Sequence, residues 1–119
     1  MQPQRRLTVR FEDELDLARV DELNRATASA LAVNAVELTV DLTQVTFMDS
    51  TVINWLIQTK DQLERRLGRL RVVAAPEGQL VRLLTLTGLE EEINVDLQGN
   101  VQLEPMAAIS TVVLGPAIA

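Results

Sequence analysis

Cysteine, histidine and tyrosine are absent from this 119-residue sequence, and it has only two phenylalanines and one tryptophan. Without cysteine or histidine, no thiolate redox centre, Cys–His or Ser–His–Asp nucleophile, or zinc site of the usual kind can be assembled. Carboxylates and hydroxyls are the groups left for chemistry. We therefore expect no metal site, no catalytic residues and no cofactor.

Positive charge is also scarce. Eleven Lys and Arg stand against 17 Asp and Glu, which gives a formal net charge of −6. Nucleic-acid binding depends on neutralising phosphates with Lys and Arg, so this balance argues against a nucleic-acid partner. An acidic chain of this kind more often binds other proteins.

Long apolar runs are missing as well. The longest uncharged stretch is the tail from Pro105 to Ala119, which is shorter than the roughly 20 residues that span a membrane. No uninterrupted apolar run follows Arg5 and Arg6, so we expect the start of the sequence not to be a secretory signal. The length suits one domain, residues 1–119, that folds without disulfides, and we expect it to be cytoplasmic without membrane insertion.

Strand and helix periods alternate along the chain. A strand is predicted at 7–11, and an amphipathic helix from Leu17 to about Val33 with Asp16 as N-cap. A buried strand at 36–42 and a short apolar burst at 45–48 lead into the longest helix, which ends at Gly68. A strand at 70–75, a helix at 77–86 closed by Gly88, and a weak strand at 93–97 follow. The order predicts an α/β fold with a mainly parallel sheet of four to five strands and helices packed on it.

The tail is expected to form a final helix, opened by Glu104 and Pro105, that packs against the domain. Its apolar residues Ile109, Val112 and Val113 would serve equally well to cap the core or to close a homodimer.

The sharpest local signal is the segment from Thr46 to Leu56. An apolar strand ends there, and Asp49, Ser50 and Thr51 begin an amphipathic helix without a spacer. Free backbone N–H groups and the positive dipole end at the first turn stabilise anions, so a phosphate on Ser50 would be accommodated there. Asp and Ser are also ordinary N-cap residues, a role that needs no further function.

Trp55 stands on the same helix. Helical geometry puts it off the apolar face of Ile53, Leu56 and Ile57, so we expect it either to be exposed and anchor a partner or to pack half-buried against a loop.

Two acidic groups, at 12–16 and at 90–92, raise the possibility of a catalytic carboxylate pair, but nothing in the sequence brings them into one cleft, and solvated loop charge is the favoured interpretation. Four arginines cluster around the end of the longest helix: Arg65, Arg66, Arg69 and Arg71. They suit its negative dipole end, which is favoured over an anion site.

Three segments, in order, carry a family resemblance. Glu14–Asp16 resembles a G-E-L-D segment before the first helix, residues 40–51 resemble the strand and turn that lead into a D-S-[ST]-G-L motif, and Leu83–Leu89 resembles the segment after the third strand. Together they resemble the STAS domain of bacterial anti-sigma-factor antagonists.

The resemblance implies a regulator of transcription and not an enzyme. It implies that a partner anti-sigma factor with a GHKL-type kinase fold phosphorylates Ser50, that the unmodified form binds this kinase, and that a PP2C-type phosphatase resets the cycle. By motif position Asp49 aids recognition, Thr51 flanks the site and Asp16 lies near the same end of the sheet. The predicted partner-binding residues are Asp16, Asp49, Ser50, Thr51, Val52 and Trp55.

Two residues depart from the family pattern. Val52 and Asp13 stand where the family has glycine, and a β-branched side chain at 52 is expected to hinder the approach of a kinase to Ser50. Val52 and Trp55 together motivate the alternative, a STAS interaction module without phospho-regulation that docks on a transporter ATPase or a signalling assembly.

Overall fold

The chain alternates strands and helices, as its hydrophobic periods predict. The computed structural model describes residues 5–97 and the backbone of residues 109–114. Its elements in chain order are β1 (Arg6–Leu15), the 3₁₀ turn η1 (Leu17–Arg19), α1 (Val20–Ala32), β2 (Glu37–Met48), α2 (Ser50–Glu64), β3 (Arg69–Ala74), α3 (Gln79–Thr87), β4 (Val95–Leu97) and β5 (Ile109–Leu114).

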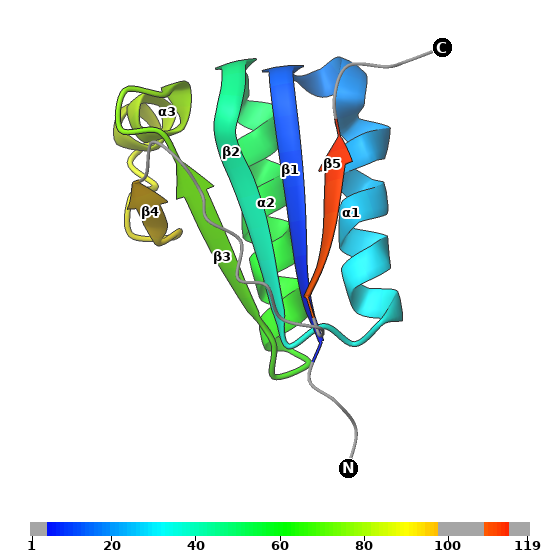
Figure 1. The fold of residues 1–119 in the computed structure, drawn as a ribbon. Coiled ribbons are helices and arrows are strands. Elements are labelled where there is room, and N and C mark those ends of the chain that lie inside the picture. Colours follow the sequence, from blue (N-terminus) through cyan, green and yellow to red (C-terminus); the bar gives the residue numbers. More distant parts are fainter. Residues whose placement is uncertain (1–4, 98–108, 115–119) are drawn as a thin grey trace.

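The five strands form one sheet in the order β4-β3-β2-β1-β5, and all four pairings are parallel. Helices α1 and α2 lie against one face of this sheet (Figure 1). Each helix connects two neighbouring parallel strands, which is the usual crossover in an α/β fold. The predicted fold class is confirmed.

The core lies between the sheet and these helices. Alternate side chains of β1 and β2 point into it and are almost completely buried, and the apolar faces of the helices meet them. The main contributors are Val9, Phe11, Leu38, Val40, Val72, Leu23, Leu56 and Leu63. Burial of this many large apolar side chains is what holds the strand ends, and the loops after them, in place.

The prediction of a helix in the tail is wrong for the part that the structure describes. Residues 109–114 form β5, which pairs with β1 from Arg6↔Ile109 to Phe11↔Leu114. The run from Ile109 to Leu114 is rich in β-branched residues, which suit a strand better than a helix. Glu104 and Pro105, which were expected to open the helix, lie outside the described residues.

The predicted end of the longest helix is also wrong. Helix α2 ends at Glu64, and Leu67 is 95% exposed instead of extending its buried face. Leu67 takes a left-handed backbone, φ 63°, and the Gly68 N–H then donates to the Leu63 carbonyl at 2.8 Å. Leu67 therefore closes the helix, although it fits the apolar spacing of the sequence.

None of the helices in the described part of the chain has the length and apolar character needed to cross a bilayer.

Candidate partner-binding and phosphorylation site

Two loops meet at the carboxyl-terminal edge of the sheet. Strand β1 ends at Leu15 beside Met48, the last residue of β2, and the chain continues into Asp16 and Asp49 respectively. Because β1 and β2 are parallel and adjacent, the starts of η1 and α2 lie side by side at this edge. The predicted proximity of Asp16 to the Asp49–Thr51 segment follows from this register.

The Asp49 carboxylate joins the two loops. Its Oδ1 accepts the Thr51 backbone N–H at 2.9 Å, which caps α2, and its Oδ2 accepts the Leu17 N–H at 3.2 Å. Asp16 caps η1 in the same way, with its Oδ1 accepting the Ala18 N–H at 3.0 Å. Both aspartates are thus fixed by backbone donors, each cap contributing about 1 kcal/mol to stability.

Ser50 is the first residue of α2 and is exposed, whereas Asp49 and Thr51 on either side of it are half-buried. The Ser50 hydroxyl is therefore the accessible nucleophile of this segment, presented on a backbone that the Asp49 cap holds rigid. The free N–H groups and positive dipole end of a 15-residue helix lie beside it, where a phosphate would be stabilised.

A family model described as STAS domain matches residues 2–103, which is most of the chain. The chain belongs to the STAS domain family. The predicted family resemblance is thereby confirmed.

Two solved structures share the fold of this STAS domain. One is the anti-sigma factor antagonist SpoIIAA in its unphosphorylated form, with 16% identity, a TM-score of 0.59 and coverage of 85% of this chain and 86% of that one. The other is the Bacillus cell fate determinant SpoIIAA in the phosphorylated form, with 20% identity, a TM-score of 0.57 and coverage of 76% and 84%. Comparison with curated protein sequences gives no match.

Val52 and Trp55 do not belong to the surface of this STAS domain. Val52 is fully buried and Trp55 is only 4% exposed. The prediction that these two residues contact a partner at the surface is therefore wrong. The Trp55 indole Nε1 donates to the Thr27 hydroxyl on α1 at 2.8 Å. Since Val52 points into the core, its β-branched side chain does not stand over Ser50.

Asp13 occupies a position that favours glycine. Its φ is 62°, and the β1–β2 register shifts between Asp13 and Glu14. Only glycine adopts this left-handed region freely, and Asp is among the few other residues that tolerate it. Asp13 thus takes a backbone conformation that would suit the glycine expected at this position.

Two residues that sequence reasoning missed brace the site. The Arg19 guanidinium donates to the Glu12 and Glu14 carbonyls at 2.8 and 2.7 Å and pairs with Glu22. The Gln79 side chain, at the start of α3, accepts the Met48 N–H at 2.7 Å. Gln79 acts across 31 residues of sequence, and no motif marks either residue in the sequence.

The other charged clusters are accounted for by contacts within the protein. Arg65 pairs with Asp61, Arg66 donates to the Leu31 carbonyl, and Arg69 and Arg71 pair with Glu37 and Asp96 on neighbouring strands. This supports the structural interpretation of the basic cluster over an anion site.

The cavity that Glu92 lines does not bring the two acidic groups together. Glu92 lines a cavity of about 330 Å³ along α2, together with Lys60 and Asp61, and residues 12–16 are not among the residues that line it. Over the residues that the structure describes, no three carboxylates are grouped as a metal site would require.

Proposed function

We propose that this STAS domain is an anti-sigma factor antagonist that binds an anti-sigma factor with a GHKL-type kinase fold and is released when that kinase phosphorylates Ser50. A PP2C-type phosphatase would restore the binding form. The domain acts as substrate and docking partner in the cytoplasm and not as an enzyme. The observation that carries the proposal is the exposed Ser50 hydroxyl on the capped start of α2, beside Asp16 and Asp49.

The chemical step is supplied by the kinase. The Ser50 Oγ attacks the γ-phosphorus of ATP, the hydroxyl proton passes to a base of the kinase, and the bond to ADP breaks. The product carries about −1.5 to −2 charges next to the Asp49 carboxylate. A partner that docks over this edge would have to desolvate that dianion, which opposes binding.

The alternative, an interaction module without phospho-regulation, depended on an exposed Trp55 and on an obstructive Val52. Both side chains are buried. Neither residue therefore favours this alternative over the phospho-switch.

The first prediction concerns the modified residue. Incubation with ATP and a GHKL-type kinase encoded near this gene is expected to add one phosphate to Ser50, measured by mass spectrometry. Thr51→Ala, which removes the neighbouring hydroxyl and leaves the Asp49 cap in place, is the matched control and keeps the modification. Ser50→Asp is expected to bind the kinase more weakly than Ser50→Ala. Phosphate on Thr51, or equal binding of both Ser50 variants, would contradict the switch.

A further inference from the structure

Two large apolar side chains are exposed on either side of the Asp49 link. Leu17 is 66% exposed and Phe47 is 44% exposed. Leu17 donates its backbone N–H to Asp49, and Phe47 precedes Asp49 by two residues. An isolated exposed leucine carries no meaning, but here two exposed apolar residues lie on the two segments that meet at Asp49, next to the exposed serine of the proposed switch.

The backbone that carries Leu17 is held rigidly. Its own N–H is bound by Asp49, the next N–H is bound by Asp16, and the Arg19 N–H donates to the Asp16 carbonyl at 2.9 Å. A backbone fixed in this way loses little conformational entropy when a partner binds, which favours Leu17 as a contact point.

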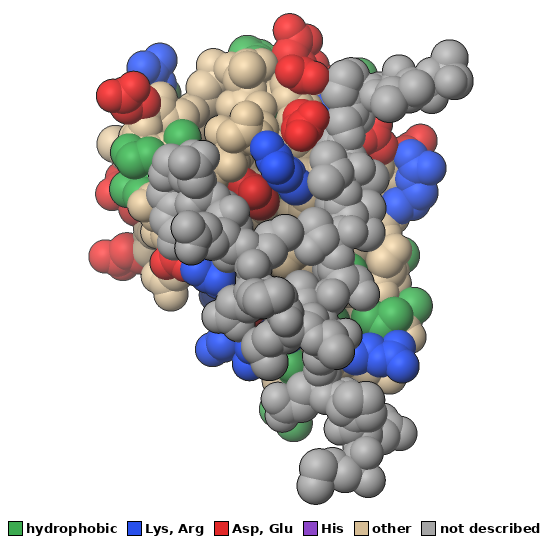
Figure 2. Space-filling view, in the orientation of Figure 1, with side chains coloured by type: hydrophobic (Ala, Val, Ile, Leu, Met, Phe, Trp, Pro, Cys, Tyr) green, Lys and Arg blue, Asp and Glu red, His purple; other side chains and the backbone are tan. Residues whose placement is uncertain are grey.

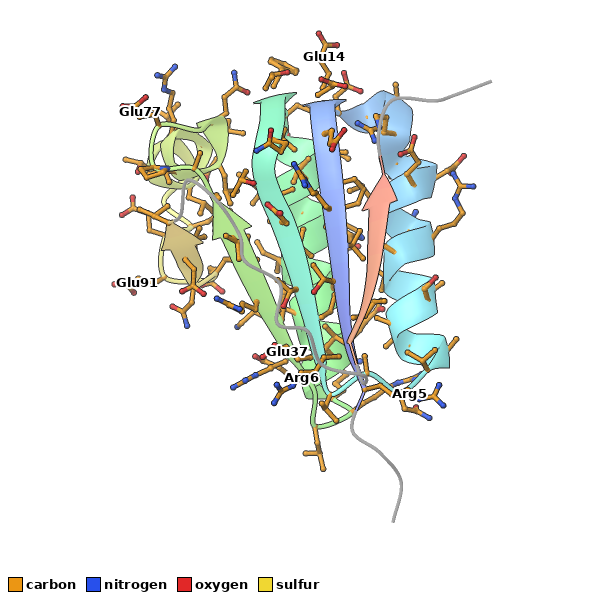
Figure 3. The ribbon with its side chains drawn as sticks, viewed as in Figure 1. Arg5, Arg6, Glu14, Glu37, Glu77 and Glu91 are labelled. Atoms are coloured by element: carbon orange, nitrogen blue, oxygen red, sulfur yellow. The ribbon has the colours of Figure 1, made fainter. Side chains whose placement is uncertain are left out.

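The surroundings of these two side chains are acidic. We call the five carboxylates at this edge the acidic rim: Glu12, Asp13, Glu14, Asp16 and Asp49. The nearby Arg19 side chain is 11% exposed and engaged with backbone carbonyls and Glu22, so it presents little positive charge to solvent. A basic group paired with the rim is Arg10, whose Nε lies 3.7 Å from a Glu12 carboxylate oxygen. Figure 2 shows acidic side chains at the end of β1 with a basic side chain below them, and Figure 3 puts Glu14 at this end of the sheet, with Arg5 and Arg6 at the opposite end.

We propose that Leu17 and Phe47 are the apolar contact points of the docking surface, and that the partner meets them with an apolar recess bordered by Arg and Lys. The acidic rim selects this partner chemistry, since like charges across an interface are unfavourable. The inference rests on the proposed function and names the surface of the same site that the kinase occupies.

The test measures the affinity of the kinase for variants of the full chain by calorimetry. Leu17→Ser is expected to raise Kd by about tenfold and Phe47→Ser by several-fold. Leu67→Ser and Leu86→Ser are the matched controls, because both leucines are at least 75% exposed and belong to other parts of the surface. Each control is expected to change Kd by less than about twofold. Thermal melts followed by circular dichroism separate a loss of binding from a loss of fold, and Phe47→Gln serves if Phe47→Ser is unstable.

Charge is tested separately. Glu14→Gln is expected to lower the association rate and to flatten its dependence on salt, as for a rim charge.

If Ser50 is phosphorylated in all variants with the same Kd and the same KM, the proposed function stands and this inference is wrong. If the wild type instead self-associates and Leu17→Ser abolishes that, the occupant is a second copy of this chain and a basic kinase surface is excluded. A wild type that neither binds nor becomes phosphorylated would overturn both.

Discussion

Trp55 is fixed by contacts with both α1 and the sheet. Its Nε1 donates to the Thr27 hydroxyl, and its ring meets Phe11 edge to face with the centroids 5.8 Å apart. The Thr27 and Thr59 hydroxyl oxygens lie 2.9 Å apart and share a further hydrogen bond. A buried polar chain therefore joins α1 to α2 inside an otherwise apolar interface.

Removing the Thr27 hydroxyl should be more costly than removing that of Thr59. Thr27→Val leaves the buried Trp55 N–H without an acceptor and is expected to lower the free energy of unfolding by about 2 kcal/mol. Thr59→Val keeps the Trp55 bond and should cost about 1 kcal/mol. Urea unfolding of the two nearly isosteric variants measures the difference. Equal losses would mean that the Trp55 hydrogen bond contributes nothing.

This chain of contacts explains why the sequence mispredicted Trp55. Helical spacing identifies one apolar face of α2 from Ile53 and Leu56, but α2 packs on α1 as well as on the sheet, so its buried face is wider. Thr27 and Thr59 are polar and do not look like core residues, yet both are buried. Side-chain pairing between helices cannot be derived from the period of either helix alone.

The end of α2 depends on the backbone conformations of Leu67 and Gly68. The φ of 63° at Leu67 has a steric cost of roughly 1–2 kcal/mol for an ordinary residue. At the next position, Gly68, an added Cβ would crowd neighbouring backbone atoms. The Cβ of an alanine at 68 would lie 3.0 Å from the Ala35 carbonyl oxygen and 3.3 Å from that of Leu63. Glycine is therefore favoured at position 67 by the left-handed backbone and at position 68 by the nearby carbonyl oxygens.

Opposite effects are expected from substitutions at these neighbours. Leu67→Gly should raise the free energy of unfolding by about 0.5–1 kcal/mol, after the greater entropy of the unfolded chain is subtracted. Gly68→Ala should lower it by about 1 kcal/mol or more. Thermal or urea unfolding checks both, with Leu86→Gly inside α3 as a destabilising control. A stabilised Gly68→Ala would show that the Ala35 carbonyl yields easily.

The candidate site was more predictable than the element ends. Asp49, Ser50 and Thr51 are contiguous in the sequence. Because the capping residue Asp49 directly follows a strand, this one short segment was enough to predict where the helix begins. The bond from Leu17 to Asp49 depends on strand register across 32 residues and was not foreseen. The parallel sheet followed from alternating periods, whereas β5 was mistaken for a helix because its apolar run has no clear period.

Over the whole molecule, the sheet is completed by a segment distant in sequence. Strand β5 pairs with all of Arg6–Phe11, on the side of β1 that β2 leaves free. Without β5, the backbone N–H and C=O groups on that side of β1 would form an exposed edge.

Truncation tests this dependence. A chain that ends at residue 108 is expected to lose about 3 kcal/mol or more of stability, since several ladder hydrogen bonds are removed, and to associate at high concentration through the open β1 edge. A chain that ends at Leu114 keeps all six residue pairs of β5 and is the control. Urea unfolding and light scattering measure the two effects. Equal stability of both truncated chains would contradict a structural role for β5.

The position of β5 also has a consequence for the time course of folding. The β1–β2 pairing closes a loop from residue 6 to residue 37, whereas the β1–β5 pairing joins residue 6 to residue 109. At about 5–20 residues per second, the ribosome makes β5 several seconds after β1, during which one edge of β1 has no strand partner. The longer loop also costs more chain entropy to close. Until β5 emerges, a nascent chain of this protein thus carries an unpaired edge of β1 that is open to pairing with other chains.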